Sequence, residues 1–102
     1  MTRWASKVDD NQAAIVRDLR KMGASVQLLH MVGAGCPDIL VGWNGDMWLL
    51  EIKDGAKPPS ARKRTGPQIT WHDAWRGKPV AVVCNIREAL EAIGIPYRGV
   101  IS

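Results

Sequence analysis

The sequence has few of the residues that crosslink small proteins. Its 102 residues include only two cysteines, Cys36 and Cys84, which lack CxxC spacing and have no paired histidines nearby. Neither a zinc site nor a disulfide framework is therefore indicated, and we interpret both cysteines as reduced thiols. The length predicts one domain over residues 1–102, near the lower size at which a core forms without such crosslinks.

Long apolar runs are also absent. None approaches the roughly 18 residues of a membrane span, and the first ten residues contain no apolar signal core. We therefore expect a cytoplasmic protein with no membrane partner. What the chain does have is a net charge of +4 and a pI near 9.4, which favours a polyanionic partner because lysine and arginine displace counterions from phosphates.

The hydrophobic pattern predicts an α/β fold with the order α-β-β-β-α-β-α. A helix over 9–22 shows apolar residues at helical spacing and stops at Gly23. Short β-branched and apolar runs predict the strands, and two later segments show helical starts. The predicted strands are 25–32, 38–43, 46–53 and 79–84, and the later helices are 65–75 and 85–93.

Two of the predicted helices begin with the spacing of a capping box. In this motif the first side chain and the one three residues later satisfy each other's backbone N–H groups. Asp9 and Gln12 have this spacing, and so do Thr65 and Gln68, which flank Pro67. Proline is favoured in the first helical turn.

The dipeptide Asn44-Gly45 predicts a tight hairpin between the second and third strands. A two-residue turn of this composition suits type I′ geometry and fixes the register. Counting outward from the turn pairs Asp38 with Glu51, and Lys53 points to the same face as Glu51. Two carboxylates and a lysine are therefore expected at one end of the hairpin.

Two opposed carboxylates repel each other unless a proton or a cation lies between them. Oxygen ligands without cysteine or histidine select Mg²⁺ or Mn²⁺, so the pattern predicts a divalent-metal site. The alternative is that Asp38 merely begins a strand while Glu51 and Lys53 form the solvated end of the next one. Against it, the hairpin is apolar on both faces, and a sheet covered on both sides has no structural need for three aligned charges.

These residues also resemble a known family. The dipeptide PD at 37–38, followed by EIK at 51–53, looks like the PD-(D/E)xK nuclease signature. The context GAGCPDILVGWNGDMWLLEIKDG, together with Gln68 and Trp75, resembles the VRR-NUC branch, the virus-type replication-repair nucleases, in its minimal standalone phage-type form. The likeness covers about residues 9–93.

The resemblance implies a PD-(D/E)xK nuclease-like mixed sheet flanked by helices, and a homodimeric, Mg²⁺- or Mn²⁺-dependent DNA endonuclease. Branched DNA such as a four-way (Holliday) junction is the implied substrate, and the cytoplasm of a bacterial host is the implied location if a phage encodes the chain. By similarity, Asp38, Glu51 and the carbonyl of Ile52 hold the metal. Lys53 orients or deprotonates the attacking water, and Gln68 positions the water or the scissile phosphate.

One departure from the family concerns the first helix. Such nucleases often add an acidic residue there, yet residues 9–12 read Asp9-Asp10-Asn11-Gln12, with a neutral amide in place of the expected glutamate. Asp9 or Asp10 is a candidate substitute, and helix capping is the alternative role for both.

The segment after the third strand is basic and rich in proline. Its cations could contact the DNA backbone beside the cut, or form a solvated linker. We favour phosphate contact because the segment leaves the predicted site directly. The cations are Lys57, Arg62, Lys63 and Arg64.

Aromatic and imidazole side chains are assigned to structure rather than to chemistry. Trp71 and Trp75 could stack on unpaired bases, but their helical spacing favours core packing. His30 and His72 lack the partners of a nucleophile or a zinc site, and we interpret both as structural. A rival for the whole chain is a module that keeps the nuclease fold and grips DNA without cutting it.

Overall fold

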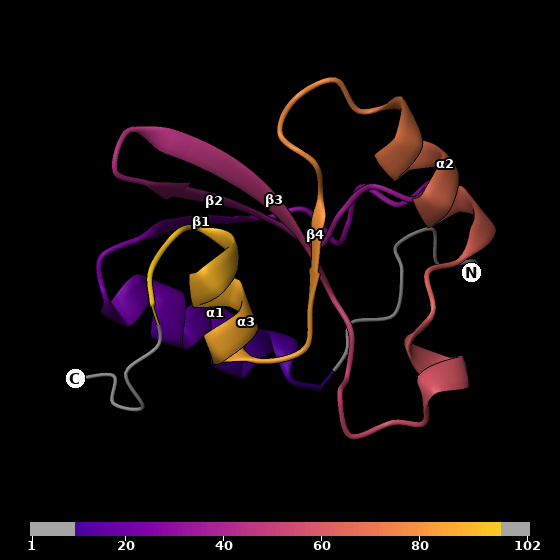
Figure 1. The fold of residues 1–102 in the computed structure, drawn as a ribbon, viewed down its shortest axis with the longest axis horizontal. Coiled ribbons are helices and arrows are strands. Elements are labelled where there is room, and N and C mark those ends of the chain that lie inside the picture. The colour runs from indigo at the N-terminus through magenta and orange to yellow at the C-terminus, as the bar shows by residue number, and fades with distance from the viewer. Residues whose placement is uncertain (1–9, 97–102) are drawn as a thin grey trace.

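The computed structural model describes residues 10–96, without the side chain of Ala61, and shows a four-stranded sheet with three helices (Figure 1). The order α-β-β-β-α-β-α is the predicted one, with one additional 3-10 turn, η1. The elements are α1 (Gln12–Lys21), β1 (Ser25–Leu28), β2 (Ile39–Trp43), β3 (Asp46–Ile52), η1 (Pro59–Arg62), α2 (Gly66–Ala74), β4 (Ala81–Val83) and α3 (Ile86–Ala92).

The sheet is mixed, with the spatial order β1-β2-β3-β4. The first three strands are antiparallel neighbours, whereas β4 runs parallel to β3. The turn between β2 and β3 has positive φ angles of 52° at Asn44 and 78° at Gly45, as a type I′ turn requires. Ile39 lies opposite Leu50, which confirms the predicted register.

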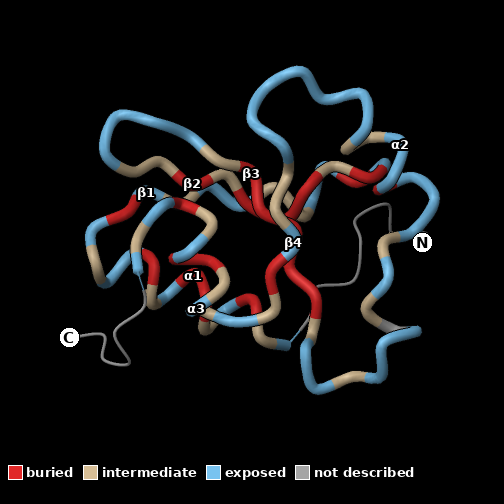
Figure 2. Tube along the Cα trace, in the orientation of Figure 1, coloured by how far each residue is buried: buried red, intermediate tan, exposed pale blue. Residues whose placement is uncertain are grey.

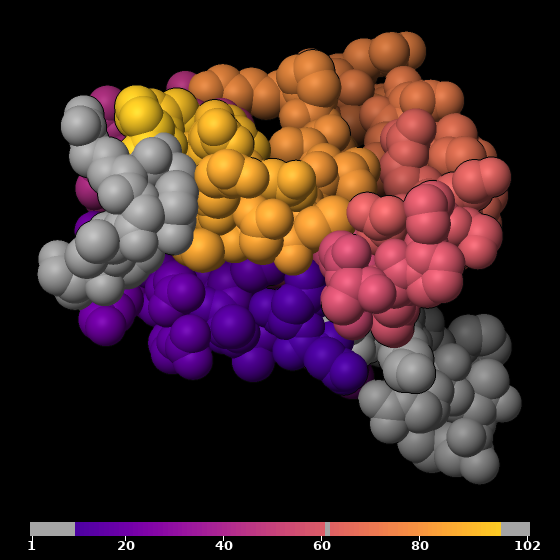
Figure 3. Space-filling model, turned by 60° about the horizontal axis from the view of Figure 1, so that its bottom comes forward, coloured from indigo at the N-terminus to yellow at the C-terminus, as the bar shows by residue number. Residues whose placement is uncertain are grey.

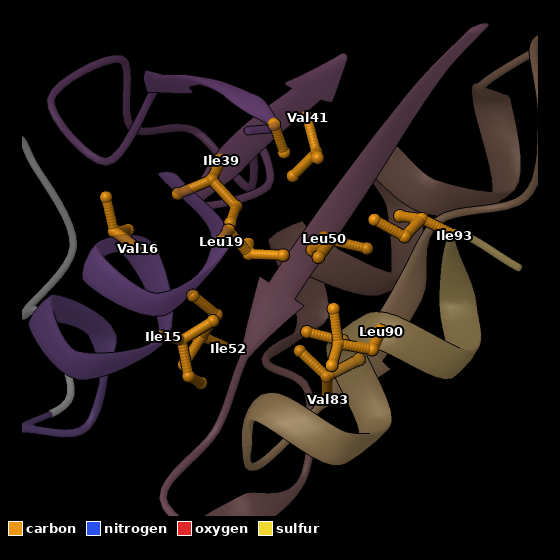
Figure 4. Close-up of a cluster of buried hydrophobic side chains, with 12 residues drawn as sticks. Ile15, Val16, Leu19, Ile39, Val41, Leu50, Ile52, Val83, Leu90 and Ile93 are labelled. Atoms are coloured by element: carbon orange, nitrogen blue, oxygen red, sulfur yellow. The ribbon is translucent and has the colours of Figure 1, made fainter. Parts of the chain in front are cut away.

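Helices α1 and α3 cover one face of the sheet and enclose the core (Figures 1 and 2). Because successive strand residues alternate between faces, every second residue of β2 and β3 points toward these helices. Figure 4 shows side chains from α1, the sheet and α3 meeting in this layer. The buried members are Ile15, Val16, Leu19, Ala24, Ile39, Val41, Leu50, Ile52, Val83, Ala89, Leu90 and Ile93.

The other face of the sheet is only partly covered. Helix α2 lies apart from α1 and α3 in Figure 1, and its side chains contact Glu51 and Lys53 on this second face. Met47, which precedes them on the same face, is 65% exposed. The expectation that the hairpin is covered on both sides is therefore wrong at its turn end and holds only at the end that contains the charges.

Strand β1 is shorter than predicted. It ends at Leu28 instead of continuing to residue 32, because the chain turns there, with the N–H of Val32 donating to the carbonyl of Leu29. One further hydrogen bond, from Leu29 N–H to the carbonyl of Asp38, attaches this turn to the start of β2. His30 therefore lies in a turn rather than in mid-strand.

The start of α1 also differs from the prediction. Asn11 occupies the N-cap position without a side-chain cap, and Gln12, the first helical residue, hydrogen-bonds His30 Nδ1 at 3.1 Å. The predicted capping box of Asp9 and Gln12 is wrong for Gln12, and Asp9 lies outside the described residues. None of the helices in residues 10–96 is long and apolar enough to cross a membrane.

Candidate active site

Asp38 is held at the point where the chain enters β2. Its side chain is buried, and its Oδ2 accepts a hydrogen bond of 2.7 Å from the backbone N–H of Ile52. Its own N–H donates to the carbonyl of Leu50 at 3.1 Å, which continues the hairpin pairing beyond Ile39. The carboxylate is thus fixed against the end of β3 by the backbone of that strand.

Glu51 and Lys53 are two residues apart near the end of β3 and point to the face opposite the core. Glu51 is 2% exposed and Lys53 is 9% exposed. Charged groups are buried to this extent only with polar partners, because the loss of hydration is otherwise too costly. Gln68 contacts both: its Nε2 donates to Glu51 Oε2 at 3.0 Å, and its Oε1 accepts from Lys53 Nζ at 2.8 Å.

Gln68 reaches this position because it also closes the cap of α2. Its backbone N–H donates to Thr65 Oγ1, and its Oε1 accepts from the N–H of Thr65 at 2.8 Å, so the predicted capping box is confirmed. The same side-chain oxygen therefore binds the helix start and Lys53. The local signal that begins α2 also orients one residue of the site.

Gly35 brings the loop before Asp38 against the start of α2. It has a φ of +86°, and a β-carbon built on it would lie 2.2 Å from the carbonyl oxygen of Pro67. Only glycine fits both the backbone conformation and this approach. The two segments that supply Asp38 and Gln68 are therefore in backbone contact.

His72 joins the site one helical turn after Gln68. Its Nε2 lies 3.5 Å from Glu51 Oε1, and its Nδ1 lies 3.1 Å from Nη1 of Arg64. Burial, and then the charge of Arg64, lowers the pKa of His72. The structural interpretation missed this proximity, although the i, i+4 spacing of Gln68 and His72 could have indicated it.

The pKa of the Cys36 thiol is affected by the charges of the site. Its pKa is raised by burial first and then by the charges of Glu51 and Asp38. Both carboxylates therefore act on the same thiol, two residues before Asp38. Cys36 is a free thiol in the structure, in line with the expectation of a reduced cysteine.

The donor set fits a hard divalent cation. Asp38 and Glu51 offer carboxylate oxygens, and the backbone of Ile52 faces Asp38, so its carbonyl lies at the same strand end. Mg²⁺ commonly uses one or two carboxylates and keeps several waters. Within residues 10–96, no three histidine, cysteine, aspartate or glutamate side chains lie close enough together to hold a metal ion. Asp10, one of the two candidate acidic residues before the first helix, is exposed.

The four basic residues after β3 do not share one environment. Arg64 contacts His72, whereas Lys63 is exposed. Burial and the charge of Glu88 raise the pKa of Cys84, and the half-buried Arg62 opposes this shift through its charge and a side-chain hydrogen bond. Lys57 is half-buried. In Figure 3 the segment forms one end of the visible surface, beside α3. Its role as a DNA contact stays a prediction.

Beside the site, α2 and the second sheet face line an apolar pocket of about 440 Å³. Trp71 and Trp75 line it and stack on each other, with centroids 5.0 Å apart and planes 17° apart. Trp75 is 44% exposed, and neither tryptophan belongs to the core cluster. The prediction that both are core residues is therefore wrong, because the helix presents this face to a pocket.

Comparisons with known proteins agree with this architecture. No family model matches the sequence, and no curated protein matches it. A solved structure described as a VRR_NUC domain matches with a TM-score of 0.59 and 23% identity, over 87% of this chain and all of that one. The chain therefore has the fold of a VRR_NUC domain, as the sequence resemblance predicted.

Proposed function

We propose that the chain is a metal-dependent endonuclease that hydrolyses phosphodiester bonds in DNA. The observation that supports this most directly is the joint burial of Glu51 and Lys53 with Gln68 bridging them, beside Asp38 at the same strand end. Buried charges aligned in this way have a cost in stability that a catalytic role explains. The VRR_NUC fold adds the expectation of nuclease chemistry by analogy.

The residues take distinct roles in this proposal. Asp38, Glu51 and the carbonyl of Ile52 hold Mg²⁺ or Mn²⁺. The bound cation would neutralise charge on the phosphate and make a bound water more acidic. Lys53 has one N–H engaged by Gln68, which leaves its other donors to orient the attacking water or to stabilise charge that develops on the phosphate.

The substrate we propose is branched DNA such as a four-way junction, cut by a homodimer. A chain of this size holds one site, so paired cuts across a junction need two subunits. Residues 10–96 show no helix-turn-helix or zinc finger for reading bases, which favours recognition of shape. A monomeric mass at micromolar concentration in light scattering would count against the dimer.

The test is Mn²⁺-dependent cleavage of a labelled four-way junction and of its matching linear duplex. Wild type is compared with Asp38→Asn, and with Asp18→Asn as a control that removes a carboxylate from α1. We expect wild type and the control to cut the junction, and Asp38→Asn to bind it without cutting. Cleavage by Asp38→Asn at the wild-type rate would remove Asp38 from the mechanism.

A second candidate is a module that binds DNA without cutting it. The neutral amide of Gln12, in place of an acidic residue on the first helix, favours this candidate because it leaves the described part of the chain with two carboxylates at the site. Binding of the junction with no cleavage in Mn²⁺ or Mg²⁺ would select it.

A further inference from the structure

Helix α2 presents two side chains, one turn apart, to the two oxygens of one carboxylate. Gln68 Nε2 donates to Glu51 Oε2 at 3.0 Å, and His72 Nε2 lies 3.5 Å from Glu51 Oε1. The side chains of His72 and Glu51 are only 4% and 2% exposed. Residues at i and i+4 lie on the same face of a helix, so both side chains can contact the same strand residue.

Arg64 determines which nitrogen of His72 bears the proton. A guanidinium only donates hydrogen bonds, so the 3.1 Å contact from Arg64 Nη1 requires Nδ1 of His72 to accept. An imidazole whose Nδ1 accepts a hydrogen bond has no proton on that nitrogen, so its single N–H is on Nε2. That proton faces Glu51.

The contact between His72 and Glu51 is slightly too long for a hydrogen bond in this structure. His72 Nε2 is buried and makes no hydrogen bond within residues 10–96. Hydrogen bonds of catalytic sites are often long before ligands bind and shorten in the loaded state. Metal-binding carboxylates are themselves usually oriented by such donors.

We propose that His72 is a positioning residue for Glu51, donating from Nε2 to Oε1 when the divalent cation is bound, with Arg64 fixing the tautomer. This inference rests on the proposed function, because it takes Glu51 to be a metal ligand. In this arrangement α2 orients Glu51 through two donors, Gln68 and His72. The same arrangement also connects the basic segment after β3 to the metal site through Arg64.

The test measures binding of Mn²⁺ alone to the full chain by calorimetry, so it needs no cleavage. His72→Gln places an amide N–H at about the reach of Nε2, whereas His72→Asn has the same chemistry and a shorter reach. Loss of a second-layer partner typically weakens metal binding 10- to 100-fold, so we expect that loss in His72→Asn and in His72→Leu. His72→Gln should stay within about threefold of wild type. Thr70→Ala, an exposed change on the same helix, is the control.

A second readout is the tautomer itself, by long-range ¹H–¹⁵N NMR of the histidines. We expect the Nε2–H form of His72 in wild type and a mixture of both forms in Arg64→Met. A protonated Nδ1 in wild type would overturn the proposal, and so would equal Mn²⁺ affinity in His72→Gln and His72→Asn. Those results would leave the nuclease proposal standing. If wild type bound no Mn²⁺, the nuclease proposal and the role of His72 would both fail.

Discussion

Gln68 has two structural roles, one in the helix cap and one in the candidate site. Its side chain completes the cap of α2 and also bridges Glu51 and Lys53. Gln68 is only 6% exposed, and its Oε1 accepts both from Thr65 at the helix start and from Lys53 in the site. The conformation of the site and the start of α2 are therefore coupled.

Substitutions at the cap should separate these two contributions. Gln68→Ala removes both, so we expect a loss of about 1–2 kcal/mol in unfolding free energy and a loss of cleavage of about 10- to 100-fold. Thr65→Ala removes the cap but keeps the amide at the site, so it should lose about 1 kcal/mol and most of the activity should remain. Urea denaturation and junction cleavage measure the two effects. Equal activity of both variants would show that the bridge has no role in catalysis.

Gly35 sets how closely the loop before Asp38 approaches α2. We expect Gly35→Ala to lower the unfolding free energy by more than about 2 kcal/mol, because the added methyl group meets the carbonyl of Pro67 and the φ angle is positive. Gly66→Ala is the matched control, since a β-carbon there meets nothing within 4 Å; its change should stay within about 1 kcal/mol. Thermal and urea denaturation measure the unfolding free energy of both variants. An unchanged value for Gly35→Ala would mean that the two segments separate easily.

At the scale of elements, the features that were predicted correctly are those set by neighbours in sequence. The Asn44-Gly45 turn fixes the hairpin register, and Thr65 with Gln68 fixes the start of α2. The start of α1 depends instead on distant residues. Asn11 Nδ2 donates to the carbonyls of Lys53 at 3.0 Å and Cys84 at 2.6 Å. No local pattern reveals a partner 73 positions away.

Asn11 therefore attaches the start of α1 to the ends of β3 and β4. We expect Asn11→Ala to reduce the unfolding free energy by about 1–3 kcal/mol, because two partly buried carbonyls lose their donor. Asn11→Asp should cost at least as much, since a carboxylate would face both oxygens. Asn85→Ala, which removes only the N-cap of α3, is the comparison, at about 1 kcal/mol. Equilibrium urea denaturation gives all three values, and a wild-type midpoint for Asn11→Asp would contradict this role.

On the scale of the whole molecule, which has principal extents of 40 × 30 × 26 Å, basic side chains lie on both sides of the sheet. The net charge of +4 favours attraction to DNA, but it does not indicate which surface the DNA would contact. The exposed Lys63 follows η1, in the segment that leads from the site to α2. Lys21 lies at the end of α1, on the face of the sheet opposite Glu51.

The two lysines should differ in how they affect salt-dependent binding of a four-way junction. Lys63→Ala should lower the slope of log affinity against log salt by about one, because one phosphate contact is lost. Lys21→Ala should leave the slope unchanged within error. Binding without divalent metal, over a range of NaCl concentrations, measures both. Equal slopes in the two variants would show that the segment after β3 does not contact the backbone.

The parallel pairing of β3 with β4 has an evolutionary consequence. The chain leaves the sheet after Ile52 and returns beside it at Ala81, so η1, α2 and the basic residues form one excursion between adjacent strands. Lengthening such an excursion is inexpensive, at about 0.6 kcal/mol per doubling of a flexible loop. Substrate preference could therefore diverge by insertion into the connections on either side of η1 and α2, while the hairpin carboxylates and the α2 residues that contact them are inherited unchanged.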